Sequence, residues 1–158
     1  MRKFLSGGLV VFAGIVSLPE RVSPQQWHRT PAPDYREDPR LESLRRFFQK
    51  GDCPALAYSQ AFIEAADVYD LDWRLLPSIS FVESTGGKVA PNNNMFGWDS
   101  GRAQFDSPTA GIQKVGYQLA HSDLYRNKNI DGILATYNPN AEYASRVKWV
   151  MRHIAVTE

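Results

Sequence analysis

The spacing of apolar residues is the feature that most constrains how this chain can fold. From Arg40 onward, apolar residues recur three and four positions apart, in segments that begin at a proline or capping residue or end at glycine. These segments span about 40–50, 54–70, 73–85, 107–121, 131–136 and 140–154. The pattern predicts helices that bury one face each, and hence a mainly α domain.

One segment interrupts this pattern. Residues 88–106 are rich in Asn and Gly and carry three aromatic side chains. Met95–Trp98 and Ala103–Phe105 are expected to pair as a short hairpin around Asp99-Ser100-Gly101. The sequence therefore predicts an α+β fold in which a small β-hairpin lobe flanks the helical domain.

The N-terminus has the pattern of an export signal. Met1-Arg2-Lys3 is basic, and an apolar run follows from Phe4 to Leu18. The run is short for a membrane span, which needs about 20 residues. Residues 1–18 are therefore interpreted as a signal peptide, with an uncleaved N-terminal anchor as the alternative. We expect an exported protein of the periplasm or cell envelope, which contacts a membrane only through these residues.

The next segment has a composition unsuited to a core. Residues 19–40 hold half of the chain's ten prolines among polar and charged residues, and are predicted to form a linker. The prolines are Pro19, Pro24, Pro31, Pro33 and Pro39. The folded domain is then expected to span 41–158.

Charge and cysteine content exclude several classes of protein. Eighteen basic and 17 acidic residues give a net charge of +1, which argues against nucleic-acid binding. The single cysteine, Cys53, excludes an internal disulfide framework and a Cys-rich zinc site. It is predicted to be a buried, inert thiol; a nucleophilic role lacks a neighbouring base. No spacing of histidines suggests a metal site.

Glu83 is the most informative residue for chemistry. On a helical projection it falls within the same arc as Leu75, Ile79 and Val82. A carboxyl on a buried stripe loses hydration, which raises its pKa and suits it to general acid catalysis. The alternative is a structural carboxyl that binds loop backbone. The Asn-rich, aromatic loop that follows favours a sugar-binding cleft, because amides and flat rings suit sugars.

A family resemblance rests on Asp72–Lys88 and the following Asn93–Trp98. These segments resemble the bacterial glucosaminidase family (mannosyl-glycoprotein endo-β-N-acetylglucosaminidase-like) of the lysozyme-like superfamily, in which a helix ending in Glu-Ser-x-x-Gly-Lys precedes an Asn-x-Phe-Gly loop. Tyr137-Asn138-Pro139 and Tyr143–Val147 are similar to the family's downstream tyrosine and final helix. The resemblance covers roughly 54–154.

The resemblance implies a lysozyme-like helical domain and a cleft for the β-1,4-linked amino-sugar backbone of peptidoglycan. It implies that Glu83 protonates the glycosidic oxygen and that Tyr137 stabilises the positive sugar ring or positions its N-acetyl group. The residues it assigns to substrate binding are Asn93, Asn94, Phe96, Trp98 and Asn138. No metal or organic cofactor is needed, and we expect a monomer whose partner is the glycan strand.

One departure from the family concerns the second acid. Glycosidases usually use two carboxylates. The candidates for the second one are Asp99, which lies beside a turn, and Asp106. Asp106 has an alternative role as the cap of the following helix. Without a second acid, the substrate's own groups could complete the reaction, as in lytic transglycosylases that form anhydro-muramyl ends. A non-catalytic peptidoglycan-binding module is the other alternative.

Overall fold

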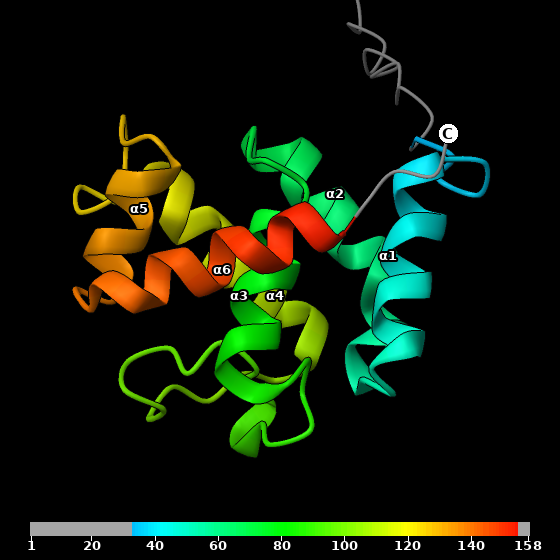
Figure 1. Cartoon of the computed structure of the whole chain (residues 1–158), viewed down its shortest axis with the longest axis horizontal. Coiled ribbons are helices and arrows are strands. Elements are labelled where there is room, and N and C mark those ends of the chain that lie inside the picture. The colour runs from blue at the N-terminus through cyan, green and yellow to red at the C-terminus, as the bar shows by residue number, and fades with distance from the viewer. Residues whose placement is uncertain (1–32, 155–158) are drawn as a thin grey trace, which may run out of the picture. The chain divides into compact units, whose positions relative to one another are not determined.

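The computed structural model describes residues 33–154, and all structural statements below concern this part of the chain. The predicted signal or anchor (1–18), most of the predicted linker (19–32) and residues 155–158 lie outside it. The prediction of a mainly α fold is confirmed. The elements are α1 (Pro39–Lys50), η1 (Pro54–Tyr58), α2 (Ser59–Tyr69), α3 (Leu75–Ser84), η2 (Pro91–Asn93), α4 (Pro108–His121), α5 (Ile130–Tyr137) and α6 (Ala141–His153), where η marks a 3₁₀-helix (Figure 1). Within 33–154, no helix combines the length and apolarity needed to cross a bilayer.

Local capping explains where two of the helices begin. The Ser107 hydroxyl accepts a hydrogen bond from the Ala110 amide at 3.1 Å, and Pro108 occupies the first position of α4. The Asn140 side chain accepts from the Glu142 amide at 2.8 Å at the start of α6. Both starts match the sequence-based prediction, because these caps depend only on residues adjacent in the chain.

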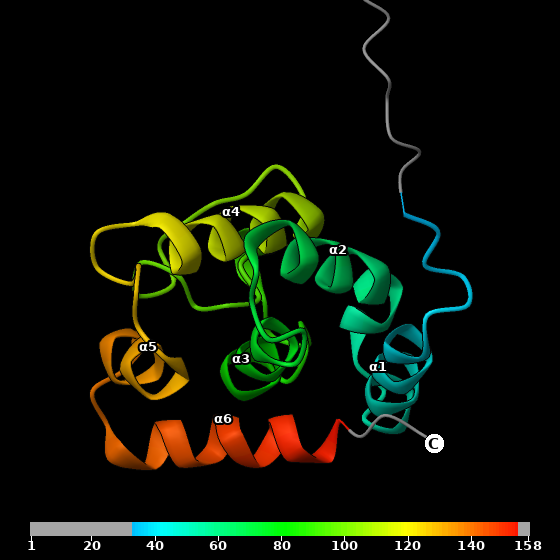
Figure 2. The same ribbon diagram turned by 90° about the horizontal axis from the view of Figure 1, so that it is seen from above.

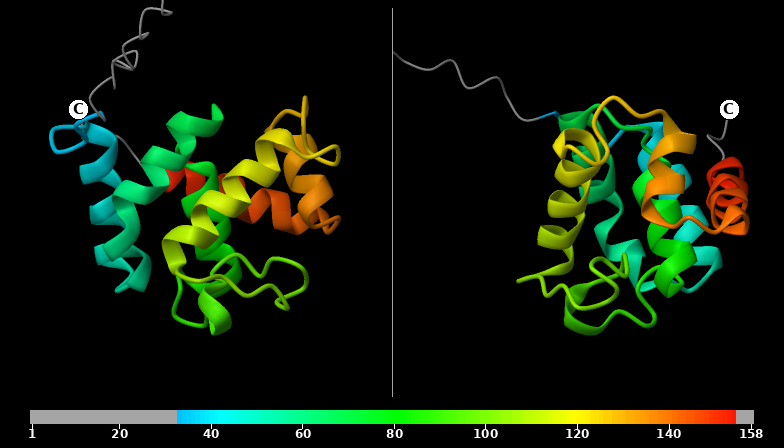
Figure 3. Two further views of the ribbon diagram at one scale, coloured as in Figure 1. Left: turned by 180° about the vertical axis from the view of Figure 1, so that it is seen from behind. Right: turned by 90° about the vertical axis from the view of Figure 1, so that its left-hand side faces the viewer.

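Helix α3 is the central element. In Figure 2 it lies between α6 on one side and α2 with α4 on the other, and α1 and α5 flank it. Its residues Leu75, Leu76 and Ile79 are almost completely buried. The helix begins at Leu75 rather than at 73. It ends at Ser84 because Thr85 adopts a left-handed conformation (φ 55°). The segment 88–106 follows and lies at this C-terminal end of α3 (Figure 3).

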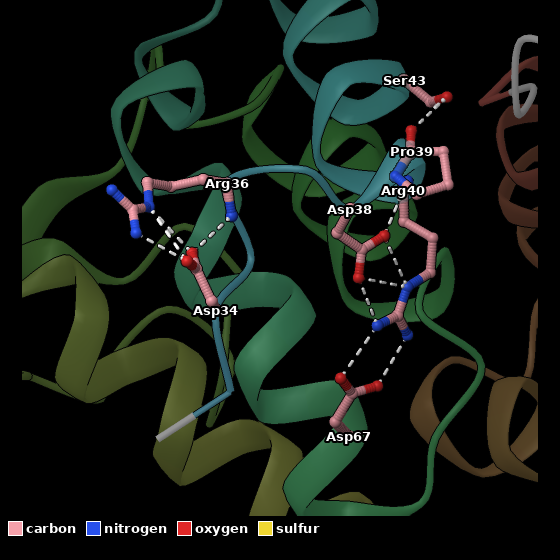
Figure 4. A network of polar contacts seen from close by, with 7 residues as sticks. All are labelled: Asp34, Arg36, Asp38, Pro39, Arg40, Ser43 and Asp67. Atoms are coloured by element: carbon pink, nitrogen blue, oxygen red, sulfur yellow. Dashed lines mark hydrogen bonds and ion pairs between the residues drawn. The ribbon is translucent and has the colours of Figure 1, made fainter. Parts of the chain in front are cut away.

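The end of the predicted linker belongs to the folded domain. Helix α1 begins at Pro39, and Tyr35 is buried in the core at 7% exposure. The Arg40 guanidinium binds Asp38 at 2.6 Å and Asp67 of α2 at 2.6 and 2.9 Å (Figure 4). We call Asp38, Arg40 and Asp67 the α1–α2 clamp. It fixes the start of α1 against α2, so the predicted boundary at residue 41 falls inside the first helix.

The predicted β-hairpin lobe is wrong, since residues 33–154 contain no strand. The Asn94 side chain accepts from the Trp98 amide at 2.9 Å and donates to the carbonyls of Trp98 (3.0 Å) and Ala103 (3.2 Å). The Asn94 amide thus bonds backbone N–H and C=O groups that two paired strands would bond to each other. Side-chain hydrogen bonds of this kind compete with regular secondary structure. Left-handed residues between them, including Gly97 and Asp99, fold the segment into an irregular loop.

Candidate active site

The last turn of α3 brings Glu83 to the irregular loop. Beside it, the buried Ser84 hydroxyl lies 2.7 Å from the Met95 carbonyl and accepts from the Gly87 amide at 2.9 Å. These contacts hold the loop against the helix end. The Glu83 side chain therefore lies near a second segment of chain.

The loop backbone passes directly against the Glu83 carboxyl at Gly97. A Cβ atom built on Gly97 would lie 2.8 Å from Glu83 Oε2, and the residue has a φ of +60°. Glycine suits both conditions, because it has no side chain to collide with the carboxyl and adopts positive φ without strain. Gly97 therefore shapes the space around the carboxyl.

The burial expected for Glu83 is wrong for the side chain as a whole, which is exposed. It is the last residue but one of α3, so the core covers only part of it. Loss of hydration still raises the pKa of Glu83 above its ordinary value, and the Tyr143 hydroxyl and the Arg146 charge offset only part of that rise. A partly desolvated carboxyl that remains open on one side can both hold a proton and meet a ligand.

Two stacked tyrosines line the inner side of this site. Tyr137 and Tyr143 have ring centroids 5.9 Å apart and nearly parallel planes. The Tyr137 hydroxyl donates to the Phe96 carbonyl at 2.5 Å, which ties α5 to the residue before Gly97. Burial raises the pKa of Tyr137 well above its ordinary value, and the Glu83 charge adds to the rise.

Tyr143 was not among the predicted site residues. It is 5% exposed, and within 33–154 its hydroxyl has no partner with full hydrogen-bond geometry. The hydroxyl nevertheless interacts with the Glu83 carboxyl, which lowers the pKa of Glu83 and contributes to the raised pKa of Tyr143. Its position on the apolar stripe of α6 indicates a core residue, and the segment Tyr143–Val147 entered the family resemblance only as part of the final helix. Its hydroxyl was the signal that could have distinguished Tyr143 from the purely apolar residues of the same stripe.

A pocket of about 390 Å³ opens beside Gly97. Trp98 forms part of its wall and packs against Tyr125 and Tyr137, at 6.1 and 5.7 Å between ring centroids. Asp99 and Ser100 supply polar groups at the same pocket. We call it the Trp98 pocket. Aromatic walls with a few polar groups are suited to a sugar ring. Tyr125 has no motif around it in the sequence, and only tertiary packing brings it here.

The structure places the other predicted binding residues differently. Phe96 is completely buried and packs edge-on against Phe62 in the core. Asn94 is 3% exposed, and the loop uses its amide. These two residues build the site and present no surface to a ligand, which corrects the prediction. Asn93 donates to the Phe105 carbonyl at 2.8 Å, and Asn138 accepts from the Asn140 amide at 3.0 Å.

The two candidate second acids differ in position. Asp99 lines the Trp98 pocket and forms an ion pair with Arg102 at 2.7 Å. Asp106 is exposed outside this pocket, and the cap of α4 is the neighbouring Ser107 rather than Asp106. Neither acid is among the groups that shift the pKa of Glu83. In the described part of the chain, no three His, Cys, Asp or Glu side chains gather as a metal site would require.

Comparison with known proteins yields no relative. No protein-family model, curated protein or solved structure matches the chain significantly. The glucosaminidase resemblance stays a prediction that rests on Asp72–Lys88 and Asn93–Trp98.

Proposed function

We propose that this protein is an exported, peptidoglycan-cleaving glycosidase of the lysozyme-like type, with Glu83 as general acid. The observation that carries the proposal is the Glu83 carboxyl itself. It has a raised pKa and contacts the loop at Gly97, and Gly97 in turn lines a pocket with aromatic walls. The resemblance of Asp72–Lys88 to glucosaminidases points to the β-1,4-linked amino-sugar backbone as the substrate.

In this reaction the protonated Glu83 carboxyl donates its proton to the glycosidic oxygen as the C1–O bond breaks. The raised pKa keeps a larger fraction of the carboxyl protonated at a given pH than an ordinary Glu would have. The Tyr137 hydroxyl binds the Phe96 carbonyl, so we assign it to positioning the loop while its ring faces the sugar. This differs from the direct role that the family resemblance implied.

A lytic transglycosylase reaction is the second candidate. Retaining glycosidases place their two carboxyl groups about 5–5.5 Å apart, where like charges couple strongly. Among residues 33–154, no carboxylate is one of the groups that shift the pKa of Glu83. After the bond breaks, the Glu83 carboxylate can take the proton of the substrate's 6-hydroxyl as that oxygen bonds to C1. The product then has an anhydro end and no water is consumed.

The full chain incubated with purified peptidoglycan tests both candidates. Glu83→Gln should lower the release of soluble fragments by about a hundredfold or more, the usual contribution of general acid catalysis. Glu37→Gln, a change at an exposed carboxyl before α1, is the control and should cleave normally. Cleavage by the wild type should decline as the pH rises through the raised pKa of Glu83.

Mass spectrometry of the fragments separates the mechanisms. Reducing ends indicate hydrolysis, and anhydro-muramyl ends indicate transglycosylation. Equal rates for Glu83→Gln and the wild type would show that Glu83 is not the acid. If the protein binds insoluble peptidoglycan but releases no fragments at any pH, it is a non-catalytic binding module and not an enzyme.

A further inference from the structure

A hollow with an apolar floor lies between α1, α3 and α6. It consists of two cavities of about 430 and 350 Å³, which adjoin because Phe81 and Trp149 line both. Helix α6 crosses α3 and ends beside α1, so side chains of all three helices meet there (Figure 2). We call the two cavities together the Trp149 groove. Neither Glu83 nor any residue of the Trp98 pocket lines it.

The surface of the groove is formed by apolar side chains that the core leaves partly uncovered. Phe47 of α1 and Phe81 of α3 pack at 5.0 Å between ring centroids, and both remain partly exposed. Trp149 of α6 is 52% exposed and is the only tryptophan among the exposed large hydrophobic residues of 33–154. The His153 ring stacks on its indole at 3.8 Å between centroids. Exposed apolar surface that borders a hollow is typical of a binding site.

The charged side chains that line the groove all have the same sign. Arg146 lines the first cavity, Arg46 and Lys50 line the second, and no acidic residue of 33–154 lines either one. Arg46 is bound to Glu42 on its own helix at 2.8 Å, and Arg146 acts on the Glu83 carboxyl. Lys50 is exposed at the end of α1. The groove therefore combines an apolar floor with a positively charged lining, which complements a ligand that is both apolar and acidic.

We propose that the Trp149 groove binds a peptide segment of another protein, in which apolar side chains are flanked by Asp or Glu. Each cavity takes one apolar side chain against Trp149, and the carboxylates meet Lys50 at the second cavity and Arg146 at the first. Charge selects this occupant over the chain's own residues 19–32, whose Arg21 and Arg29 outnumber the single Glu20. The inference goes beyond the proposed function and does not depend on it.

The probe is a library of random dodecamer peptides displayed on phage and selected on the full chain. The enriched peptides should combine apolar with acidic residues, and fluorescence anisotropy of a synthetic copy then measures its affinity. Trp149→Ala should weaken binding about tenfold or more, because truncation of a central tryptophan removes much of the affinity of an interface. Tyr117→Ala on α4 is the matched control and should bind as the wild type does. Tyr117 is a 48% exposed aromatic residue outside both cavities.

A charge reversal tests the acidic part of the ligand. Lys50→Glu should weaken binding of the enriched peptide about threefold at low salt, and the loss should shrink as salt screens the charges. Replacing the acidic residues of the peptide by their amides should remove the difference between Lys50→Glu and the wild type. Lys88→Glu, at an exposed lysine outside both cavities, is the control and should not change the affinity. Thermal unfolding checks that each variant remains folded.

Several outcomes would overturn the inference. They are the failure to enrich any peptide, enrichment of peptides without acidic residues, and equal affinities for Trp149→Ala and the wild type. If the wild type dimerises in sedimentation and Trp149→Ala does not, the occupant is a second copy of the chain and the inference is wrong. It is also wrong if Trp149 is needed for binding to phosphatidylglycerol vesicles while no peptide is enriched. None of these measurements depends on peptidoglycan cleavage, so failure of the proposed function is distinguishable from failure of this inference.

Discussion

The α1–α2 clamp and the Glu83 site both set carboxyl groups at a helix end, yet they shift pKa values in opposite directions. Hydrogen bonds from Arg40 lower the pKa values of Asp38 and Asp67. Desolvation raises the pKa of Glu83, and the nearby Arg146 does not reverse it. The clamp stabilises ionised acids, whereas the site makes the ionisation of Glu83 less favourable than in water.

The two regions also differ in how fully their polar groups are bonded. In the clamp, each carboxylate accepts at least two hydrogen bonds from one guanidinium. Near Glu83, the buried Tyr143 hydroxyl lacks a fully formed partner. An incompletely bonded polar group costs stability, and proteins tend to concentrate such costs at functional sites. The clamp therefore satisfies its own polar groups, whereas the Glu83 site leaves one of its polar groups incompletely bonded.

Among changes that leave Glu83 in place, the largest effect should follow Gly97→Ala. The new methyl group would lie 2.8 Å from Glu83 Oε2 and displace the carboxyl, so peptidoglycan cleavage should fall between about tenfold and a hundredfold. Gly101→Ala imposes a similar positive-φ strain (+81°) but meets no atom within 4 Å. Fragment release and thermal unfolding are measured for both. Equal activity in the two variants would show that the space beside Glu83 does not matter.

A smaller effect, on stability alone, should follow Arg40→Ala. Loss of bonds to two partly buried carboxylates should lower the free energy of unfolding by about 1–2 kcal/mol at pH 7, allowing for solvent screening. The pKa values of Asp38 and Asp67 are lowered in the fold, so this stability is present above the ordinary value of 3.8. It should disappear as the pH falls through the lowered values.

Urea unfolding at pH 7 and at pH 2.5 measures this contribution. Arg36→Ala is the control, since Arg36 and Asp34 form an exposed ion pair and their separation should leave stability unchanged. Equal stability of Arg40→Ala and the wild type at pH 7 would contradict the structural role of the clamp.

The smallest effect should be a gain of stability from Glu83→Gln. Because the folded pKa of Glu83 is raised, the folded state binds this proton more tightly than the unfolded state does. Ionisation of Glu83 therefore lowers the free energy of unfolding of the wild type as the pH rises above the ordinary pKa of Glu. Glutamine does not ionise, so the variant avoids this loss. Tm should be slightly higher for Glu83→Gln at pH 7 and equal to the wild type near pH 3. A lower Tm at pH 7 would show that the Glu83 charge is stabilising, as in the clamp.

The helices were predictable where a few adjacent residues decide the outcome. Ser107 and Asn140 cap the helices that follow them, and Tyr143, Val147 and Val150 are buried as their spacing predicts. Such signals are local, so sequence alone contains them.

The loop and parts of the site depended on contacts that no local pattern encodes. The expected hairpin failed because the Asn94 amide occupies the backbone groups of Trp98 and Ala103. Tyr125 and Tyr143 reach the site only through the packing of later segments. The helical projection of Glu83 assumed a core along the whole of α3, whereas the core covers only part of its last turn.

The bond from the Tyr137 hydroxyl to the Phe96 carbonyl joins residues 41 positions apart and has a consequence for biosynthesis. A growing chain contains Glu83 well before it contains Tyr137, Tyr143 and Arg146, which surround that carboxyl. Until α5 has folded, the loop lacks its bond to Tyr137, and until α6 packs against α3 the carboxyl lacks Tyr143 and Arg146 beside it. A product truncated before α5 would lack all of these groups and, under the proposed function, would not cleave the glycan.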